Sequence, residues 1–223
     1  MGFGKIFSES WEDYKRNFKS IVLIMLVYLL GTLAFAGISI FSELDSAISF
    51  IYIIFLAVFG FLAYIFATGM LVNASVKHKK FSFEQAFKDM KKRYWGYLLF
   101  NVVFGIFLIG LFLLLIVPGI IFSVYWCVSS YVFFAEKKGI IASLKRSFNL
   151  VKGRWWKVLG YSLLFFLIYF AIWIPFGIVA GVFELLHAEL IAQVIDNASF
   201  FVTIPLSVLF YKNLYLALKT KKF

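Results

Sequence analysis

Residues 97–135 read YLLFNVVFGIFLIGLFLLLIVPGIIFSVYWCVSSYVFFA, and this stretch decides the fold. It contains no Asp, Glu, Lys or Arg, so all of it can enter lipid without burying a charge. As one helix it would extend about 60 Å, whereas the apolar core of a bilayer is about 30 Å thick. Pro118-Gly119 places a turn signal inside it. We therefore expect a hairpin of two membrane spans, Tyr97–Val117 and Gly119–Ala135.

The composition of the whole chain points the same way. Of its 223 residues, 63% are hydrophobic and only 15% are charged, whereas a soluble domain is about half apolar. Four further apolar runs are long enough to cross the bilayer. They are Ile21–Phe41, Ala47–Leu71, Val158–Val182 and Ser199–Leu218. The sequence thus predicts an all-α integral membrane protein with six transmembrane helices arranged as three hairpins in a single membrane domain.

The cations are distributed on one side of these spans. Of the 22 Lys and Arg residues, 21 lie before the first span, after the second, after the fourth or after the sixth, and Lys212 lies near the C-terminal end of the sixth. The positive-inside rule then places both termini and the two basic connections in the cytoplasm, with the protein in the cell membrane. Because the cations are interspersed between apolar runs instead of forming one stripe, the net charge of +11 predicts contact with anionic membrane lipid and no nucleic-acid binding.

An apolar pattern recurs in the cytoplasmic segment before each hairpin, at offsets of zero, four, seven and eleven residues. Its members are Phe7, Trp11, Tyr14 and Phe18, then Phe83, Phe87, Met90 and Tyr94, then Leu144, Phe148, Val151 and Trp155. This spacing places four side chains on one stripe of an α-helix. A helix with such a stripe and an opposite basic face is typical of the headgroup region. We interpret the chain as three repeat units, residues 5–75, 81–135 and 140–218, each an amphipathic interfacial helix followed by a hairpin.

The third cytoplasmic segment is the strongest candidate for lipid contact, because residues 139–157 contain no acidic side chain. Each Lys or Arg near an anionic membrane surface contributes about 1 kcal/mol of binding free energy. The lipid-contact candidates are Lys145, Arg146, Lys152, Arg154, Trp155 and Trp156, together with Lys91, Lys92 and Arg93 of the second segment.

The sequence around Val117-Pro118-Gly119-Ile120, Glu136 and Ala142–Trp156 resembles a known pattern. It is similar to the membrane domain that precedes the catalytic domain in some bacterial glycerophosphodiester phosphodiesterases, and to the related YciC-like integral membrane proteins. In that pattern Ser143 and Ser147 occupy small-polar positions of a helix, and Leu150 its leucine. The resemblance implies a fold and a membrane location. It does not imply the phosphodiesterase reaction, which belongs to a separate soluble domain.

Ionisable residues at membrane depth often mark function, and Glu136 and Lys212 come closest to qualifying. Both lie near cytoplasmic ends of expected spans, where Lys212 can extend to the headgroups and Glu136 can cap a helix or pair with a basic neighbour. A direct ion pair between the two is the sharper hypothesis.

Other residues in the spans suggest packing or a polar pathway. Asn101 could line such a pathway or hydrogen-bond between helices. Gly177 and Gly181 have a spacing that permits close helix packing and, more weakly, suggests a dimer. Pro175 and Pro205 lie inside the last two spans, where they predict kinks or, more sharply, a broken helix of the transporter kind.

No set of residues predicts catalysis, a cofactor or a metal. Cys127 is the single cysteine, and His78 and His187 are expected on opposite sides of the membrane. We expect a non-enzymatic protein that contacts anionic lipid and organises the membrane or a partner protein, and its partners besides lipid would be another protein or further copies of this chain. The alternative is a transporter, channel or lipid translocator with a cavity near spans five and six.

Overall fold

The computed structural model describes residues 1–29 and 47–220, and within them the chain forms helices and short turns without a strand. A helix over Phe18–Leu29 follows the first labelled helix after a turn at Asn17. The labelled helices are α1 (Phe3–Arg16), α3 (Ala47–Lys77), α4 (Phe83–Lys91), α5 (Tyr94–Leu114), α6 (Ile116–Trp126), α7 (Ser129–Ala135), α8 (Ile140–Val151), α9 (Trp155–Leu185) and α10 (Glu189–Lys219).

Several long apolar helices suggest a membrane protein. Five segments of the described chain are long and apolar enough to cross a bilayer, and they coincide with the second to sixth expected spans. They are Phe50–Lys77, Tyr94–Leu114, Ile116–Ala135, Trp155–Leu185 and Asn197–Lys219. Of the first expected span, Ile21–Phe41, only the helical part up to Leu29 is described. Residues 30–41 lie outside the described residues, so the arrangement of six spans stays a prediction.

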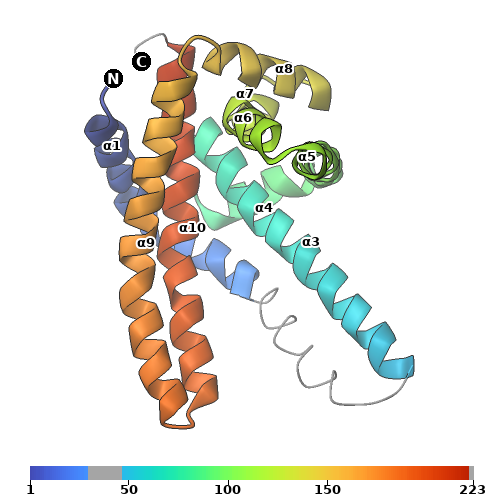
Figure 1. Cartoon of the computed structure of the whole chain (residues 1–223), viewed down its shortest axis with the longest axis vertical. Helices are drawn as coiled ribbons and strands as arrows, with labels where there is room; N and C mark the ends of the chain where they lie inside the picture. Colours follow the sequence, from blue (N-terminus) through green and yellow to red (C-terminus); the bar gives the residue numbers. More distant parts are fainter. Residues whose placement is uncertain (30–46, 221–223) are drawn as a thin grey trace.

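Helix α10 lies at the centre of the molecule. Within its apolar window 67% of the residues are buried, compared with 11% in α5 and in α9. It packs along α9 and also contacts α1, α3, α7 and α8, as Figure 1 shows. Phe210, Leu214 and Tyr215 are fully buried there. The other long helices therefore leave most of their apolar surface facing outward, as lipid-exposed helices do.

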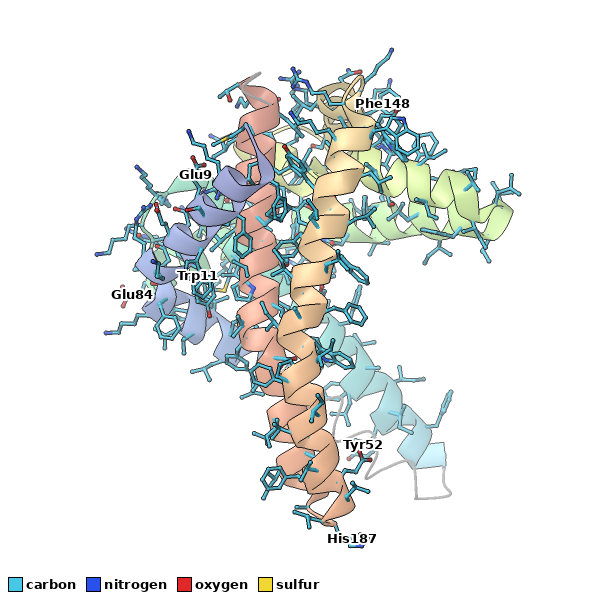
Figure 2. The ribbon with its side chains drawn as sticks, turned by 60° about the vertical axis from the view of Figure 1, so that its left-hand side comes forward. Glu9, Trp11, Tyr52, Glu84, Phe148 and His187 are labelled. Carbon is cyan, nitrogen blue, oxygen red and sulfur yellow. The ribbon has the colours of Figure 1, made fainter. Side chains whose placement is uncertain are left out.

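The apolar helices diverge from this centre. In Figure 1 the α9–α10 pair stands upright and α3 runs obliquely away, while Figure 2 shows the yellow-green α5–α6 pair extending sideways. The far ends of these elements carry the most exposed apolar side chains, with Leu113 at 81% and Leu185 at 82% exposure. Exposed apolar surface of this extent needs lipid or another apolar cover.

The turn between α5 and α6 lies earlier than the sequence predicts. Leu115 adopts the extended backbone conformation that separates the two helices, and Pro118 lies in the first turn of α6. Proline is tolerated there because the first N–H groups of a helix have no partner within the helix. A Cβ atom on Gly119 would lie 2.5 Å from the ring of Phe112. Gly119 thus permits the close contact of α5 with α6, and the predicted turn at Pro118-Gly119 is wrong by about one helical turn.

The fourth expected span, Gly119–Ala135, is interrupted. Helix α6 ends at Trp126 and α7 begins at Ser129. Two hydroxyl groups donate to carbonyls that the interruption leaves without a helical partner: Ser147 Oγ to the carbonyl of Tyr125 at 2.7 Å, and Ser129 Oγ to that of Trp126 at 2.7 Å. The small-polar position at Ser147 therefore has a structural role in fixing α8 against the break.

The prolines do not break the last two spans. Helices α9 and α10 each continue as one helix through Pro175 and Pro205, so the prediction of a broken helix there is wrong. Pro205 has no N–H to donate to the carbonyl of Phe201 four residues earlier. The hydroxyl of Tyr14 on α1 donates to that carbonyl instead, at 3.4 Å.

Candidate functional site

The three amphipathic segments end in the same local geometry. The N–H groups of Asn17, Arg93 and Arg154 each donate to the carbonyl three residues earlier, at 3.2, 2.9 and 2.9 Å. The next helix begins one residue later in every case, at Phe18, Tyr94 and Trp155. The fourth member of each apolar pattern is therefore the first residue of the following helix, and the prediction of a four-residue stripe on one helix is wrong at that member.

The third member of each pattern is the buried anchor. Tyr14 is 7% exposed, and Met90 and Val151 are fully buried. Met90 contacts α3 so closely that a Cβ atom on Gly69 would meet its methyl carbon at 2.4 Å. These buried anchors hold α1, α4 and α8 against the protein interior. The exposed side chains of the three helices include both lysines and apolar residues, among them Trp11, Phe87 and Ile141.

The nine lipid-contact candidates divide into two groups. The exposed ones are Lys91, Lys92, Lys145, Lys152 and Trp156. The other four contact the protein itself: Arg93 lies over the ring of Phe133 at 5.6 Å, Arg146 bonds to Glu136, Arg154 donates to the carbonyl of Leu218 at 3.5 Å, and Trp155 donates to that of Ile121 at 3.2 Å. The exposed group is the part of the predicted site that an external ligand can reach.

An apolar groove lies between α8 and the α5–α6 pair. It has a volume of about 360 Å³ and is lined by aromatic and aliphatic side chains, among them Phe107, Trp126 and Phe148. Its polar lining residues include Lys145 and Asn149, both exposed on α8. Phe148 lies at the end of the molecule opposite His187, as Figure 2 shows. A chain of methylene groups ending in an anion fits this combination of apolar wall and basic rim.

Glu136 organises the other face of α8. It accepts from Lys138 at 3.1 Å and Arg146 at 3.3 Å, and the hydroxyl of Tyr215 donates to it at 3.2 Å. Burial alone would raise the pKa of Glu136, but the hydrogen bond from Lys138 and the charge of Arg146 outweigh it and lower the pKa. Glu136 therefore stays ionised and joins the end of α7 to α8 and α10.

Lys212 pairs with a different acid from the one predicted. Its ammonium group bonds to the carboxylate of Asp13 on α1, and both residues are 7% exposed. The amide of Asn213 donates to the same carboxylate at 3.3 Å and to the hydroxyl of Ser10 at 3.0 Å. The hypothesis of a Glu136–Lys212 pair is wrong, because α1 packs against α10 and supplies the carboxylate that Lys212 contacts.

The sequence contains a signal for this cluster that the apolar pattern obscured. Ser10, Asp13 and Asn17 follow one another at helical spacing, and they are 0%, 7% and 3% exposed. They form a buried polar stripe beside the apolar one. Polar residues spaced in this way on a helix indicate an internal partner, which here is α10 and the loop before α4.

Asn101, Gly177 and Gly181 do not join two helices in the part of the chain that the structure describes. The amide of Asn101 donates to the carbonyl of Tyr97 on its own helix at 2.8 Å. A Cβ atom on Gly177 or Gly181 would meet nothing within 4 Å. Among the described residues these two glycines therefore make no close contact, and Gly69 and Gly119 occupy tight contacts instead.

Comparison of the chain with models of known protein families, with curated proteins and with solved structures found no match. The resemblance to the phosphodiesterase-associated membrane domain stays a prediction that rests on its residues alone.

Proposed function

We propose that this chain is a non-enzymatic membrane protein that binds anionic lipid at its α8 face, with both termini in the cytoplasm. The observation that carries the proposal is the apolar groove of about 360 Å³ beside α8, with Lys145 in its lining. An acyl chain would lie along Phe107 and Phe148, and the lipid phosphate would meet the ammonium group of Lys145.

The charge on α8 supports an anionic ligand over a neutral one. Lys145 and Lys152 are exposed, and the segment from residue 139 to residue 157 carries no acid to neutralise them. Arg146 contributes less, because Glu136 holds its guanidinium group at 3.3 Å. Trp156 is 79% exposed at the start of α9, where an indole ring suits the boundary between headgroups and hydrocarbon.

A photoreactive residue in the groove tests the proposal directly. With benzoylphenylalanine in place of Ile141, the full chain is reconstituted in nanodiscs of phosphatidylcholine and phosphatidylglycerol, and lipid adducts are quantified by mass spectrometry. We expect phosphatidylglycerol adducts in excess of its mole fraction, because Lys145 and Lys152 attract its phosphate. The double variant Lys145→Gln and Lys152→Gln should abolish the excess.

The matched control removes the same charge elsewhere. Lys5 and Lys88 are also exposed but lie on α1 and α4. The pair Lys5→Gln and Lys88→Gln should leave the excess unchanged. The proposal would be contradicted if the adducts at position 141 followed the bulk lipid composition while Lys145 and Lys152 are both present.

Transport is the second candidate, and one observation favours it. The buried pair of Asp13 and Lys212 borders a polar pocket of about 550 Å³ between α1, α3 and α10. Ionisable pairs at the edge of a membrane span occur in ion and solute pathways. Solute flux into proteoliposomes that depends on Asp13 would favour this candidate, whereas Asn101, Ser129 and Thr203 already bond to nearby backbone carbonyls and offer it no support.

A further inference from the structure

A second basic pocket lies away from α8, where the turn after α1 meets the loop before α4. It has a volume of about 680 Å³, and its cationic lining consists of Lys15, Arg16, Lys19 and Lys80. Among the described residues that line this pocket none is acidic. Two chain segments that are distant in sequence therefore present their cations to one space.

Hydrogen bonds fix these two segments against each other. The side-chain oxygen of Asn17 accepts from the N–H of Phe81 at 2.9 Å, and its amide donates to the carbonyl of Lys79 at 3.2 Å. The hydroxyl of Ser20 donates to the carbonyl of Phe81 at 2.7 Å. Because Asn17 is 3% exposed and Phe81 is also 3% exposed, the floor of the pocket is a buried and preorganised junction.

The lysines of the pocket lie at the surface, where an external anion can reach them. Arg16 shares its charge with Asp13 at 2.9 Å, outside the pocket lining. Lys15, Lys19 and Lys80 are exposed. The N-terminus of α4 is already occupied, since Ser82 and Gln85 cap it reciprocally at 3.2 Å. The lysines, not the helix end, would bind an anion here.

We propose that this pocket binds a phosphate group, either in the headgroup of an anionic phospholipid or as free inorganic phosphate. Phe18 borders the lysines, is 53% exposed and begins the apolar helix Phe18–Leu29. An acyl chain could continue from the pocket along that helix. The site is separate from the α8 groove and does not depend on lipid binding there.

The test again uses the full chain in nanodiscs, now with benzoylphenylalanine in place of Phe18. Phosphatidylglycerol adducts should exceed its mole fraction, and Lys15→Gln with Lys80→Gln, one lysine from each segment, should remove the excess. A parallel arm adds inorganic phosphate to nanodiscs of phosphatidylcholine alone and follows its ³¹P line width. The same double variant should weaken phosphate binding by about fivefold for each lysine removed.

The two arms distinguish the sources of phosphate. Excess lipid adducts that need Lys15 and Lys80 assign the site to a headgroup, and line broadening that needs them assigns it to free phosphate. The control pair Lys5→Gln and Lys88→Gln should change neither readout, and adducts at residue 141 should be unaffected by the loss of Lys15 and Lys80. If residue 18 yields adducts in proportion to bulk lipid and the phosphate line width is constant, or if both double variants act equally, the proposal is overturned.

Discussion

The carboxylate of Asp13 lies at the centre of a buried polar cluster. Lys212, Arg16 and Asn213 all donate to it within a largely buried site. Removing Lys212 would leave this buried carboxylate with only the more exposed Arg16 as a counter-charge, and the loss of one partner of a buried ion pair is strongly destabilising. Lys212→Met should therefore lower the free energy of unfolding by about 3–5 kcal/mol, which thermal unfolding in lipid or detergent would measure.

A second variant separates charge from packing in that experiment. Asp13→Asn combined with Lys212→Met removes both charges and should recover much of the loss. If the double variant is as unstable as the sum of the two single variants, the pair is not energetically coupled.

Glu136 should make the stability of the protein depend on pH in the acidic range. Its pKa is lower than the ordinary value of 4.5, so its interactions contribute stability above that value and lose it as pH falls through the depressed pKa. The unmodified chain should therefore lose stability below about pH 4.5 more steeply than Glu136→Gln does. Melting temperatures measured across that range, with exposed Glu84→Gln as control, check the sign; equal slopes would exclude this role for Glu136.

At the scale of helices, the close contact between α5 and α6 depends on Gly119, which has no side chain. Gly119→Ala would force its Cβ against the ring of Phe112 and should destabilise the protein by about 1–3 kcal/mol. Gly105→Ala on α5 is the matched control, because a Cβ there would meet nothing within 4 Å and alanine favours helix formation. In thermal unfolding, Gly119→Ala should have a lower melting temperature than the unmodified protein and Gly105→Ala a higher one. Equal melting temperatures of the two variants would contradict the contact.

Helix positions could be predicted from the sequence more accurately than helix ends and partners. The expected spans from Ala47 onward coincide with apolar helical segments because each is an uninterrupted apolar run, although the fourth is divided between α6 and α7. The break after Trp126 could not be found in this way, since Cys127 and Val128 are as apolar as their neighbours. The turn at Leu115 was misplaced because Pro118 suits the first turn of a helix as well as it suits a turn.

The candidate site could be predicted only in part for a different reason. Exposed Lys145 and Lys152 follow from local composition, because an amphipathic helix turns its charges outward. The partner of Lys212 required knowing that α1 packs on α10, and nothing local to either helix encodes that contact.

At the scale of the whole molecule, the one-sided distribution of cations predicts its orientation. Single cysteines in place of Lys5, Lys88 and Lys152, in a Cys127→Ala background, should all react with an impermeant maleimide from the cytoplasmic side. Leu186 is 68% exposed at the turn between α9 and α10, and Leu186→Cys should react only from outside. Labelling of intact cells against inverted vesicles measures this, and any lysine position that reacts in intact cells would refute the orientation.

The pairing of the first helix with the last has a consequence for biosynthesis. A chain leaves the ribosome from its N-terminus, so Asp13 is synthesised long before Lys212 and has only the neighbouring Arg16 as a counter-ion during most of translation. Helix α1 therefore has no α10 surface to pack against until α10 has been inserted. The packing of α1 against α10 would then be a late step of assembly.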